Sequence, residues 1–414
     1  MSFRRTAAAV SALGVALSLS LWAGNAAAQA TIRIANIDAL SGPAASIGSD
    51  QERGMRIALD EINAAGGIKS LGGAKLEVVN YDTQSNVQTA QSQAEKAISE
   101  GAVVIIGGAQ SAPTLTVSTV AERAKIPMIA GTAAAQEITT RGYQYTFRLG
   151  VPPSLSTRSV GEDMMYFFKS SNRPLKTLVH VYEDGPFGGS VQAIYSKLAE
   201  TSGFKLEAMS FKTGSADLSG LMARLKRVEA DGMVFTGYTP DCITFTEALR
   251  EANISFPYMN LGTSLIEDSY VKAIGWKSME GFVGYQYFNQ HLRPKGNEGG
   301  PVKFYDAYKK KYGFEPQFTA SFGYTELRTL AKALNAAGST DPQKLRDALS
   351  KVELGAADGH IMPYSAVKFD SAGQNLNGNI MVVQALKGRF DVITPVDYAT
   401  AKPLVPVPAW SQKR

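Results

Sequence analysis

Ser111 stands where a buried strand is expected to end and a helix to begin, a position at which backbone amides can bind an anion. It follows Gly107 and Gly108, and Pro113 falls in the first turn of the expected helix, where no amide donor is needed. The free amides of this turn and the Ser111 hydroxyl would converge on a small anion such as a carboxylate. The alternative is that Ser111 is a plain helix cap.

A second loop of small residues, 130–135, follows the next expected strand along the chain. If the strands are parallel and adjacent, this loop should face Ser111. Its small side chains would let backbone groups at Ala133 and Ala134 reach a solute, and Thr132 would add a hydroxyl. The alternative is that small residues are present here to permit close helix packing.

Aromatic side chains near later strand ends could cover an apolar part of a solute. Tyr238 comes just after an expected strand, Phe187 lies in the loop 184–188, and Tyr285 belongs to an aromatic run that starts at Phe282. Each of these side chains could instead belong to a hydrophobic core.

The residues that could support catalysis form no recognisable pattern. His180, His291 and His360 are far apart and have no metal-binding spacing. Cys242 lies among apolar residues in a helical pattern, which favours a buried, inert thiol. The sequence has neither a Gly-x-Ser-x-Gly elbow nor a phosphate-binding loop. We therefore expect neither an enzyme, nor a metal site, nor a cofactor.

The elements that must position these residues alternate between strand and helix, which predicts parallel sheets covered by helices. The expected strands are 32–38, 76–82, 103–106, 128–130, 177–182, 206–211, 233–235 and 257–261. The expected helices are 51–65, 87–100, 113–125, 190–202, 218–228, 240–252, 301–312 and 321–337, and a strand-rich end begins at Ile361.

The first thirty residues have the order of a removable export segment. Arg4 and Arg5 precede an apolar run over 7–22, and small residues follow at 26–28. A membrane anchor is the alternative, but the apolar run is shorter than the roughly 20 residues that a spanning helix needs. The sole cysteine, Cys242, is far from the cleavage point, so no lipid can be attached there. We therefore expect a protein free in the periplasm.

Composition limits what the rest of the chain can be. About 385 residues remain after export. A single hydrophobic core seldom serves a chain of this length, so two domains are expected. Loss of Arg4 and Arg5 lowers the formal net charge from +5 to +3, and this small excess argues against nucleic acid as a partner. A single cysteine permits no internal disulfide.

Taken together, the motifs resemble the extracytoplasmic solute-binding proteins of branched-chain-amino-acid-type ABC transporters, the Leu/Ile/Val-binding or type I group. The resemblance covers nearly the whole chain after the export segment. The motifs that carry it are 34–48, 60–68, 79–83, 104–108 with Ser111, 141–148, 237–240 and 318–324. It implies two Rossmann-like α/β lobes with parallel sheets, joined by a three-strand hinge, and closure on a solute delivered to a membrane permease.

On this basis lobe 1 is predicted to comprise 31–150 plus 282–358, and lobe 2 to comprise 151–281 plus 359–414. The protein is expected to act as a monomer. The predicted ligand-binding residues are Ile47, Gln110, Ser111, Thr132, Ala133, Ala134, Phe187, Tyr238 and Tyr285.

The sequence departs from the amino-acid-binding pattern of this group at two places. Such proteins usually have a hydroxyl where Ala134 stands and an acidic side chain near Gly262 and Thr263. An ammonium buried without a partner would be costly, which favours an aromatic or other organic acid as solute. A branched-chain or other apolar amino acid, an amide, and a sensor that signals to a partner remain alternatives. The acidic residues that could replace the missing one are Asp184, Asp241 and Asp268.

Overall fold

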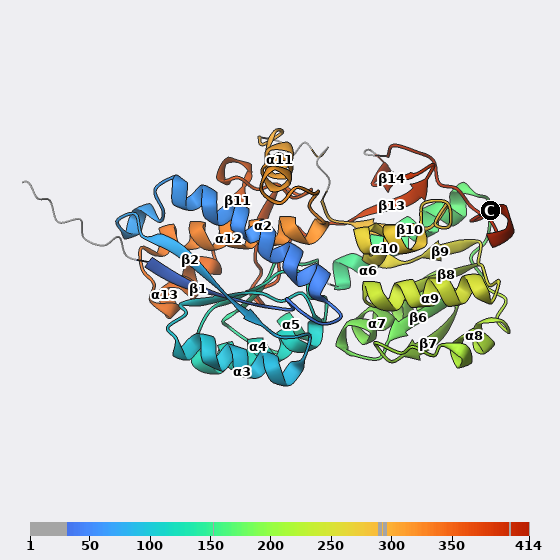
Figure 1. Cartoon of the computed structure of the whole chain (residues 1–414), viewed down its shortest axis with the longest axis horizontal. Coiled ribbons are helices and arrows are strands. Elements are labelled where there is room, and N and C mark those ends of the chain that lie inside the picture. Colours follow the sequence, from blue (N-terminus) through green and yellow to red (C-terminus); the bar gives the residue numbers. More distant parts are fainter. Residues whose placement is uncertain (1–30, 152, 289–291, 293–295, 397–398, 414) are drawn as a thin grey trace, which may run out of the picture.

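The computed structural model divides into two lobes that lie side by side along its long axis, each built on its own sheet (Figure 1). It describes residues 31–151, 153–288, 292, 296–396 and 399–413. The export segment predicted for 1–30 and His291 lie outside these described residues. None of the helices in the described part combines the length and apolar character that a membrane crossing needs.

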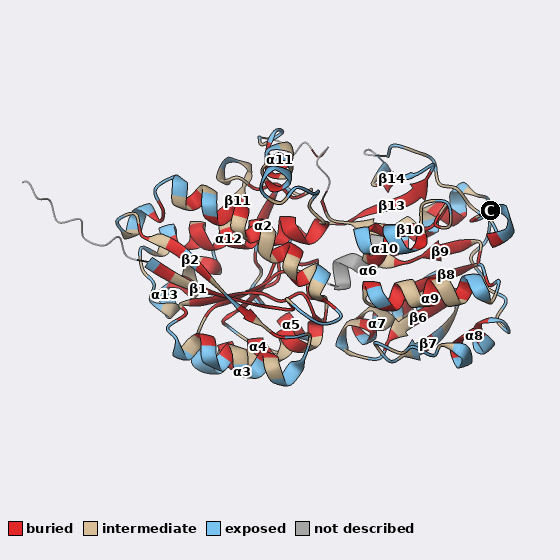
Figure 2. Cartoon of the chain, viewed as in Figure 1, coloured by how far each residue is buried: buried red, intermediate tan, exposed pale blue. Residues whose placement is uncertain are grey.

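Lobe 1 contains a five-stranded parallel sheet in the order β2-β1-β3-β4-β5, so the predicted strand alternation is confirmed here. Helices cover both faces, and the strands are accordingly buried (Figure 2). The strands are β1 (Thr31–Asp38), β2 (Lys75–Asp82), β3 (Val104–Gly107), β4 (Met128–Ala130) and β5 (Thr146–Arg148). The helices are α2 (Ala45–Ala64), α3 (Val87–Ser99), α4 (Ser111–Ala124), α5 (Glu137–Thr140), α11 (Gly300–Tyr312), α12 (Phe318–Ala337) and α13 (Pro342–Leu349).

Helices α2 and α12 cross in close contact because glycine stands at the crossing point on each helix. A Cβ on Gly54 would lie 1.8 Å from the Ala320 carbonyl oxygen, and one on Gly323 would lie 1.8 Å from the Gln51 carbonyl oxygen. The buried carboxylate of Asp50 joins the two helices, accepting a hydrogen bond from the Ala320 amide at 2.7 Å. This contact attaches the late helix α12 to the first lobe.

Lobe 2 contains a seven-stranded sheet in the order β14-β13-β10-β9-β8-β6-β7, in which β13 and β14 are antiparallel additions to a parallel core. A separate antiparallel pair, β11 with β12, belongs to the last third of the chain. The strands of the seven-stranded sheet are β6 (Thr177–Glu183), β7 (Lys205–Phe211), β8 (Gly232–Thr236), β9 (Tyr258–Asn260), β10 (Val283–Gln286), β13 (Met381–Leu386) and β14 (Arg389–Thr394). The separate pair comprises β11 (Glu353–Gly355) and β12 (Ala366–Lys368), and β11 lies beside the lobe 1 helices (Figure 1). The helices are α6 (Pro153–Ser170), α7 (Pro186–Ser202), α8 (Ser219–Leu225), α9 (Thr239–Glu251) and α10 (Asp268–Ile274). Short 3₁₀ turns are η1 (Lys69–Leu71), η2 (Gly262–Ile266), η3 (Ala356–Asp358) and η5 (Trp410–Lys413).

The chain passes between the lobes three times: after β5, after β10 and before β13. The second crossing comes later than residue 282, because β10 pairs within the lobe 2 sheet. The third comes later than residue 359, because Phe369 packs against Phe147 with ring centroids 5.2 Å apart and Gln374 pairs with Arg148. We therefore propose that 359–375 belongs to lobe 1 rather than to lobe 2.

Arg148, at the end of β5, is fully buried and joins the first and third crossings. Its guanidinium donates to Gln374 Oε1 at 2.6 Å, to the Ala135 carbonyl at 2.7 Å and to Thr139 Oγ1 at 3.1 Å. Burial lowers the pKa of Arg148 to about 10. One side chain therefore positions both the hinge and the loop that follows β4.

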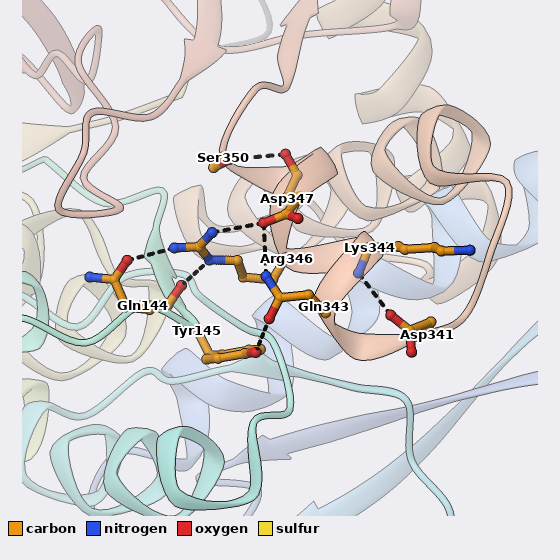
Figure 3. A network of polar contacts seen from close by, with 8 residues as sticks. All are labelled: Gln144, Tyr145, Asp341, Gln343, Lys344, Arg346, Asp347 and Ser350. Carbon is orange, nitrogen blue, oxygen red and sulfur yellow. Dashed lines mark hydrogen bonds and ion pairs between the residues drawn. The ribbon is translucent and has the colours of Figure 1, made fainter.

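Helix α13 is fixed to the segment before β5 by polar contacts (Figure 3). Tyr145 Oη donates to Gln343 Oε1 at 2.5 Å, and the Arg346 guanidinium donates to the Gln144 carbonyl at 3.1 Å. Asp341 caps the helix by accepting from the Lys344 amide at 3.0 Å. These bonds hold the returning helices against lobe 1.

Candidate functional site

A cleft of about 140 Å³ lies between the lobes, where the parallel strands of both sheets reach their carboxyl ends. Such strand ends are the usual ligand position in open α/β sheets. Lobe 1 contributes Ile47, Ala109, Ser111, Thr132, Ala134, Phe318 and Phe322, and the crossings contribute Gly150, Val151 and Tyr287. Lobe 2 contributes Phe187, Val191, Ile194, Tyr195, Val234, Phe235, Thr236, Gly237, Tyr238, Leu261, Gly262, Thr263, Ser264, Tyr285 and Ile380.

Seven of the nine predicted residues line this cleft, and their role in binding stays a prediction. The two that do not are neighbours of lining residues. Ala133 is 2% exposed and is buried beneath its loop. Gln110 lies beside a separate small cavity that also touches Asp38. The seven lining residues are Ile47, Ser111, Thr132, Ala134, Phe187, Tyr238 and Tyr285.

Ser111 begins helix α4, and its hydroxyl oxygen holds the neighbouring loop. Ser111 Oγ accepts hydrogen bonds from the Ala134 amide at 3.2 Å and the Ala135 amide at 3.0 Å. The first helical bond comes from the Thr114 amide to the Gln110 carbonyl, so the Ser111 and Ala112 amides precede the helical ladder. The sequence analysis missed this bond between Ser111 and the loop, because it depends on how β3 and β4 are placed.

The loop after β4 is also supported from behind by buried polar side chains. Thr132 Oγ1 donates to Gln51 Oε1 at 3.3 Å, and Gln51 Nε2 donates to the Glu326 carboxylate at 3.0 and 3.1 Å. Burial raises the pKa of Glu326 well above its ordinary value, and the nearby Asp38 carboxylate adds to the rise. Gln51 and Glu326 therefore support the lobe 1 wall without lining the cleft themselves.

Asp38 at the end of β1 orients a further part of this wall. Its Oδ1 accepts from the Ala39 amide at 2.8 Å and from the amide of Ala109, a lining residue, at 2.9 Å. Burial raises the pKa of Asp38 to about 6, although these two hydrogen bonds oppose the rise.

Tyr238 reaches from lobe 2 to the start of α4 in lobe 1. Burial raises the pKa of its hydroxyl, and the Glu183 carboxylate adds to the rise, while hydrogen bonds from the Gln110 side chain and the Ser111 backbone oppose it. The Tyr238 ring also packs against Phe187, with centroids 5.7 Å apart. The two predicted aromatic residues therefore form one wall that meets lobe 1.

A second contact between the lobes involves Ser190 in the first turns of α7. Its hydroxyl oxygen accepts from the Gln136 amide at 3.1 Å, and it donates to Glu137 Oε2 at 3.4 Å. Together with the Tyr238 contact, these two hydrogen bonds join lobe 2 to lobe 1 beside the cleft.

A tyrosine and asparagine cluster forms the part of the cleft next to β10. Tyr195 Oη and Tyr285 Oη are 3.0 Å apart, and Asn260 Nδ2 donates to Tyr285 Oη at 2.8 Å and to Tyr258 Oη at 3.0 Å. The sequence analysis named Tyr285 but missed Tyr195 and Asn260. Asn260 ends β9, so its position at a strand end could have singled it out in the same way as Tyr238. Tyr195 could not be singled out, because its position in the sequence is that of an ordinary buried residue of α7.

No charged side chain lines the cleft among the residues that the structure describes. Gly262 and Thr263 stand where the amino-acid-binding pattern has an acidic side chain, and Ala134 stands where it has a hydroxyl. All three residues line the cleft. The aspartates considered as replacements, Asp184, Asp241 and Asp268, are not among the lining residues. The cleft therefore offers hydroxyls, backbone groups and apolar surface.

Other chemistry-bearing residues are buried away from the cleft surface. Cys242 is fully buried, and burial raises the pKa of its thiol. Within the described ranges, no group of His, Cys, Asp and Glu side chains is arranged to hold a metal ion.

These features define a class: a two-lobed α/β protein with a cleft of ligand size between its two sheets. A family model described as "Periplasmic binding protein" matches residues 31–389, and the chain belongs to this family. Its members are substrate-binding proteins of ABC transporters, not enzymes, and the relatives below place the chain in the type I, branched-chain-amino-acid group.

Among curated proteins, Leu/Ile/Val-binding protein homolog 8 of Brucella abortus is 29% identical over 399 residues, which cover 94% of this chain and 96% of that one. Among solved structures, the leucine-binding protein LivK of Thermotoga maritima is similar with a TM-score of 0.75 and 23% identity, covering 88% of this chain and 99% of that chain. A solute-binding protein from R. palustris, solved with benzoate, has a TM-score of 0.73 and 18% identity, covering 92% of this chain and 98% of that one.

Proposed function

We propose that this protein captures a small aromatic or other organic acid in the periplasm and delivers it to the permease of an ABC importer. The observation that carries the proposal is the cleft itself, which both lobes line and which has no charged side chain among the described residues. Solute would bind lobe 1 first, and lobe 2 would then close over it.

The lobe 1 wall supports binding of a carboxylate. The Ala112 amide lies in the first turn of α4, where the helix dipole favours an anion, while the Ser111 amide donates to the Tyr238 hydroxyl. The Ser111 oxygen already accepts from Ala134 and Ala135, so its remaining hydrogen is available as a donor. A carboxylate can accept from the Ala112 amide and from the Ser111 hydroxyl.

The size and surface of the cleft support an aromatic ring. Phe187, Tyr238, Phe318 and Phe322 present ring surfaces to it. Its volume of about 140 Å³ is close to that of an engineered apolar cavity of about 150 Å³ that binds benzene. The benzoate complex of the R. palustris relative shows that this fold can hold such a ligand.

The same cleft argues against an α-amino acid. An α-ammonium enclosed by the lobes would need an acceptor of negative charge, and burial of an unpaired charge is expensive. The described lining residues include no Asp or Glu. The ammonium would have to donate its hydrogen bonds to lining hydroxyls and carbonyls instead of to a carboxylate.

A branched-chain amino acid is the second candidate, because the relatives favour it. The LivJ protein of Streptococcus pneumoniae, solved with isoleucine, is similar over 88% of this chain with a TM-score of 0.75 and 21% identity. A signalling role for the same receptor would be distinguished by its gene neighbours: a kinase gene in place of permease and ATPase genes.

A thermal-shift screen of the ligand-free protein tests the proposal, since a ligand that binds the folded state raises its melting temperature. The panel comprises benzoate, cinnamate, 3-phenylpropanoate, benzamide, leucine, isoleucine and valine. We expect stabilisation by the aromatic acids and none by the amino acids. Stabilisation by leucine with no response to any aromatic acid would overturn the proposal in favour of the second candidate.

A further inference from the structure

The hydroxyls of Tyr195 and Tyr285 form a polar site on the lobe 2 side of the cleft. The Asn260 amide is oriented by its Oδ1, which accepts from the Gly262 amide at 2.9 Å, so its Nδ2 hydrogens are directed at the phenol oxygens. Tyr195 and Tyr285 have one hydrogen each, and the bond between them uses one. One phenol donor of the pair is therefore left over beside the cleft.

Thr236 provides the complementary group, because His180 determines which way its hydroxyl donates. Gln192 Nε2 donates to Ser196 Oγ, so Gln192 Oε1 accepts from His180 Nδ1 at 2.5 Å. The other ring nitrogen, Nε2, is then an acceptor, and the Thr236 hydroxyl at 2.9 Å donates to it. Thr236 Oγ1 therefore presents only lone pairs to the cleft.

His180 connects the two groups: the Tyr195 ring packs on its ring with centroids 4.8 Å apart, and its Nε2 lies 2.9 Å from Thr236 Oγ1. Tyr195, Tyr285 and Thr236 all line the cleft, and Tyr195 and Thr236 are 2% and 7% exposed. A ligand group that accepts one hydrogen bond from the tyrosine pair and donates one to Thr236 Oγ1 would satisfy both sites. A hydroxyl is such a group.

We infer that the solute is a hydroxylated aromatic acid, whose ring hydroxyl accepts from the Tyr195–Tyr285 pair and donates to Thr236 Oγ1. This inference rests on the proposed function and specifies its substrate class. A ring without the hydroxyl would leave the second phenol hydrogen and the Thr236 lone pairs without a partner in the cleft, and a site built for a hydroxyl rejects an analogue that lacks it. A methoxy group could accept but could not donate.

Calorimetric titration of the wild-type protein with benzoate, 3- and 4-hydroxybenzoate, and the matching methoxybenzoates tests the inference. We expect one hydroxybenzoate to bind about tenfold or more tighter than benzoate, and tighter than its methoxy analogue. If benzoate binds as tightly as both hydroxybenzoates, the inference fails and the proposed function stands. If no aromatic acid binds but leucine does, the proposed function fails as well.

Two variants locate the effect. Tyr195→Phe and Thr236→Val should each reduce the preference for the hydroxybenzoate about tenfold while changing benzoate affinity by less than about twofold. Thr244→Val, on helix α9 and outside the cleft lining, is the matched control and should keep the preference. Circular dichroism confirms that each variant folds. A preference that survives in both folded variants would overturn the assignment to these residues.

Discussion

The two walls of the cleft are built differently. The lobe 1 wall presents backbone amides and small residues around Ser111, held from behind by buried polar groups such as Arg148 and Glu326. The lobe 2 wall presents aromatic rings and the hydroxyls of Tyr195 and Thr236. Backbone amides can bind any small carboxylate. Side chains on the lobe 2 wall can differ in type without altering the sheet, so they can distinguish one acid from another. We therefore expect lobe 1 to determine the headgroup and lobe 2 to determine which acid is chosen.

Arg148→Met should have the largest effect, because it removes the support of the lobe 1 wall. The Ala135 carbonyl, Thr139 and Gln374 would lose their donor while buried. We expect the free energy of unfolding in urea to fall by about 4 kcal/mol. Arg123→Met, on an exposed side chain of α4, is the control. A loss no larger than that of the control would show that Arg148 does not hold this wall.

The buried carboxylate of Asp38 should make the stability of lobe 1 depend on pH. Burial raises its folded-state pKa to about 6 from an ordinary value of 3.8, so folding favours the protonated form. Its contribution is full below about pH 4 and is lost as pH rises through 6, a difference of about 3 kcal/mol at most.

Asp38→Asn should therefore flatten the fall in unfolding free energy between pH 4 and 7, measured by urea titration at each pH. Asp82→Asn is the control with opposite sign. Although burial acts against it, hydrogen bonds from Ser41, Gln84 and Leu40 lower the pKa of Asp82, so its contribution is lost as pH falls. Equal slopes for wild type and Asp38→Asn would refute the assignment.

Tyr238→Ala tests the lobe 2 wall. It removes a ring that packs on Phe187 and meets the start of α4. Calorimetry should show about thirtyfold weaker binding of an aromatic acid. Tyr238→Phe keeps the ring and should lose only about threefold. If both variants bind equally, the ring does not cover the ligand.

Ser111→Ala should weaken carboxylate binding about tenfold, and it should cost about 1 kcal/mol of stability because the Ala134 and Ala135 amides lose an acceptor. Benzamide, if it binds, should lose less affinity than benzoate. Thr116→Ala, further along the same helix, is the control. Unchanged benzoate affinity in a folded Ser111→Ala protein would remove Ser111 from the site.

Ser190→Ala should have the smallest effect, because it removes only two hydrogen bonds between the lobes, one with Gln136 and one with Glu137. We expect about two- to threefold weaker binding, through a less populated closed form. Small-angle scattering of the variant with saturating ligand should still report closure. A loss above about thirtyfold would mean that these two hydrogen bonds, and not the two walls, dominate closure.

The strands and the helix that begins at Ser111 could be predicted because local patterns decide them. β4 is Met128–Ala130 as expected, and α9 begins one residue earlier than expected. The partner strands of β10 and the position of Phe369 could not be predicted, since they depend on contacts with distant residues.

The candidate site divides in the same way. Ser111 and Tyr238 follow strand ends and carried a local signal. Tyr195 lines the cleft where its hydroxyl meets that of Tyr285, a contact between distant residues that no local pattern encodes. Gln110 and Ala133 were placed on the correct loops, but their side chains do not line the cleft.

The most direct test of the central claim compares two solutes that differ only in the α-ammonium. Calorimetry with 4-methylpentanoate and leucine, and with 3-phenylpropanoate and phenylalanine, measures what an uncharged cleft does with that group. We predict that each acid binds about a hundredfold or more tighter than its amino acid, since no described lining side chain can pair with the ammonium. Tighter binding of leucine than of 4-methylpentanoate would contradict the account.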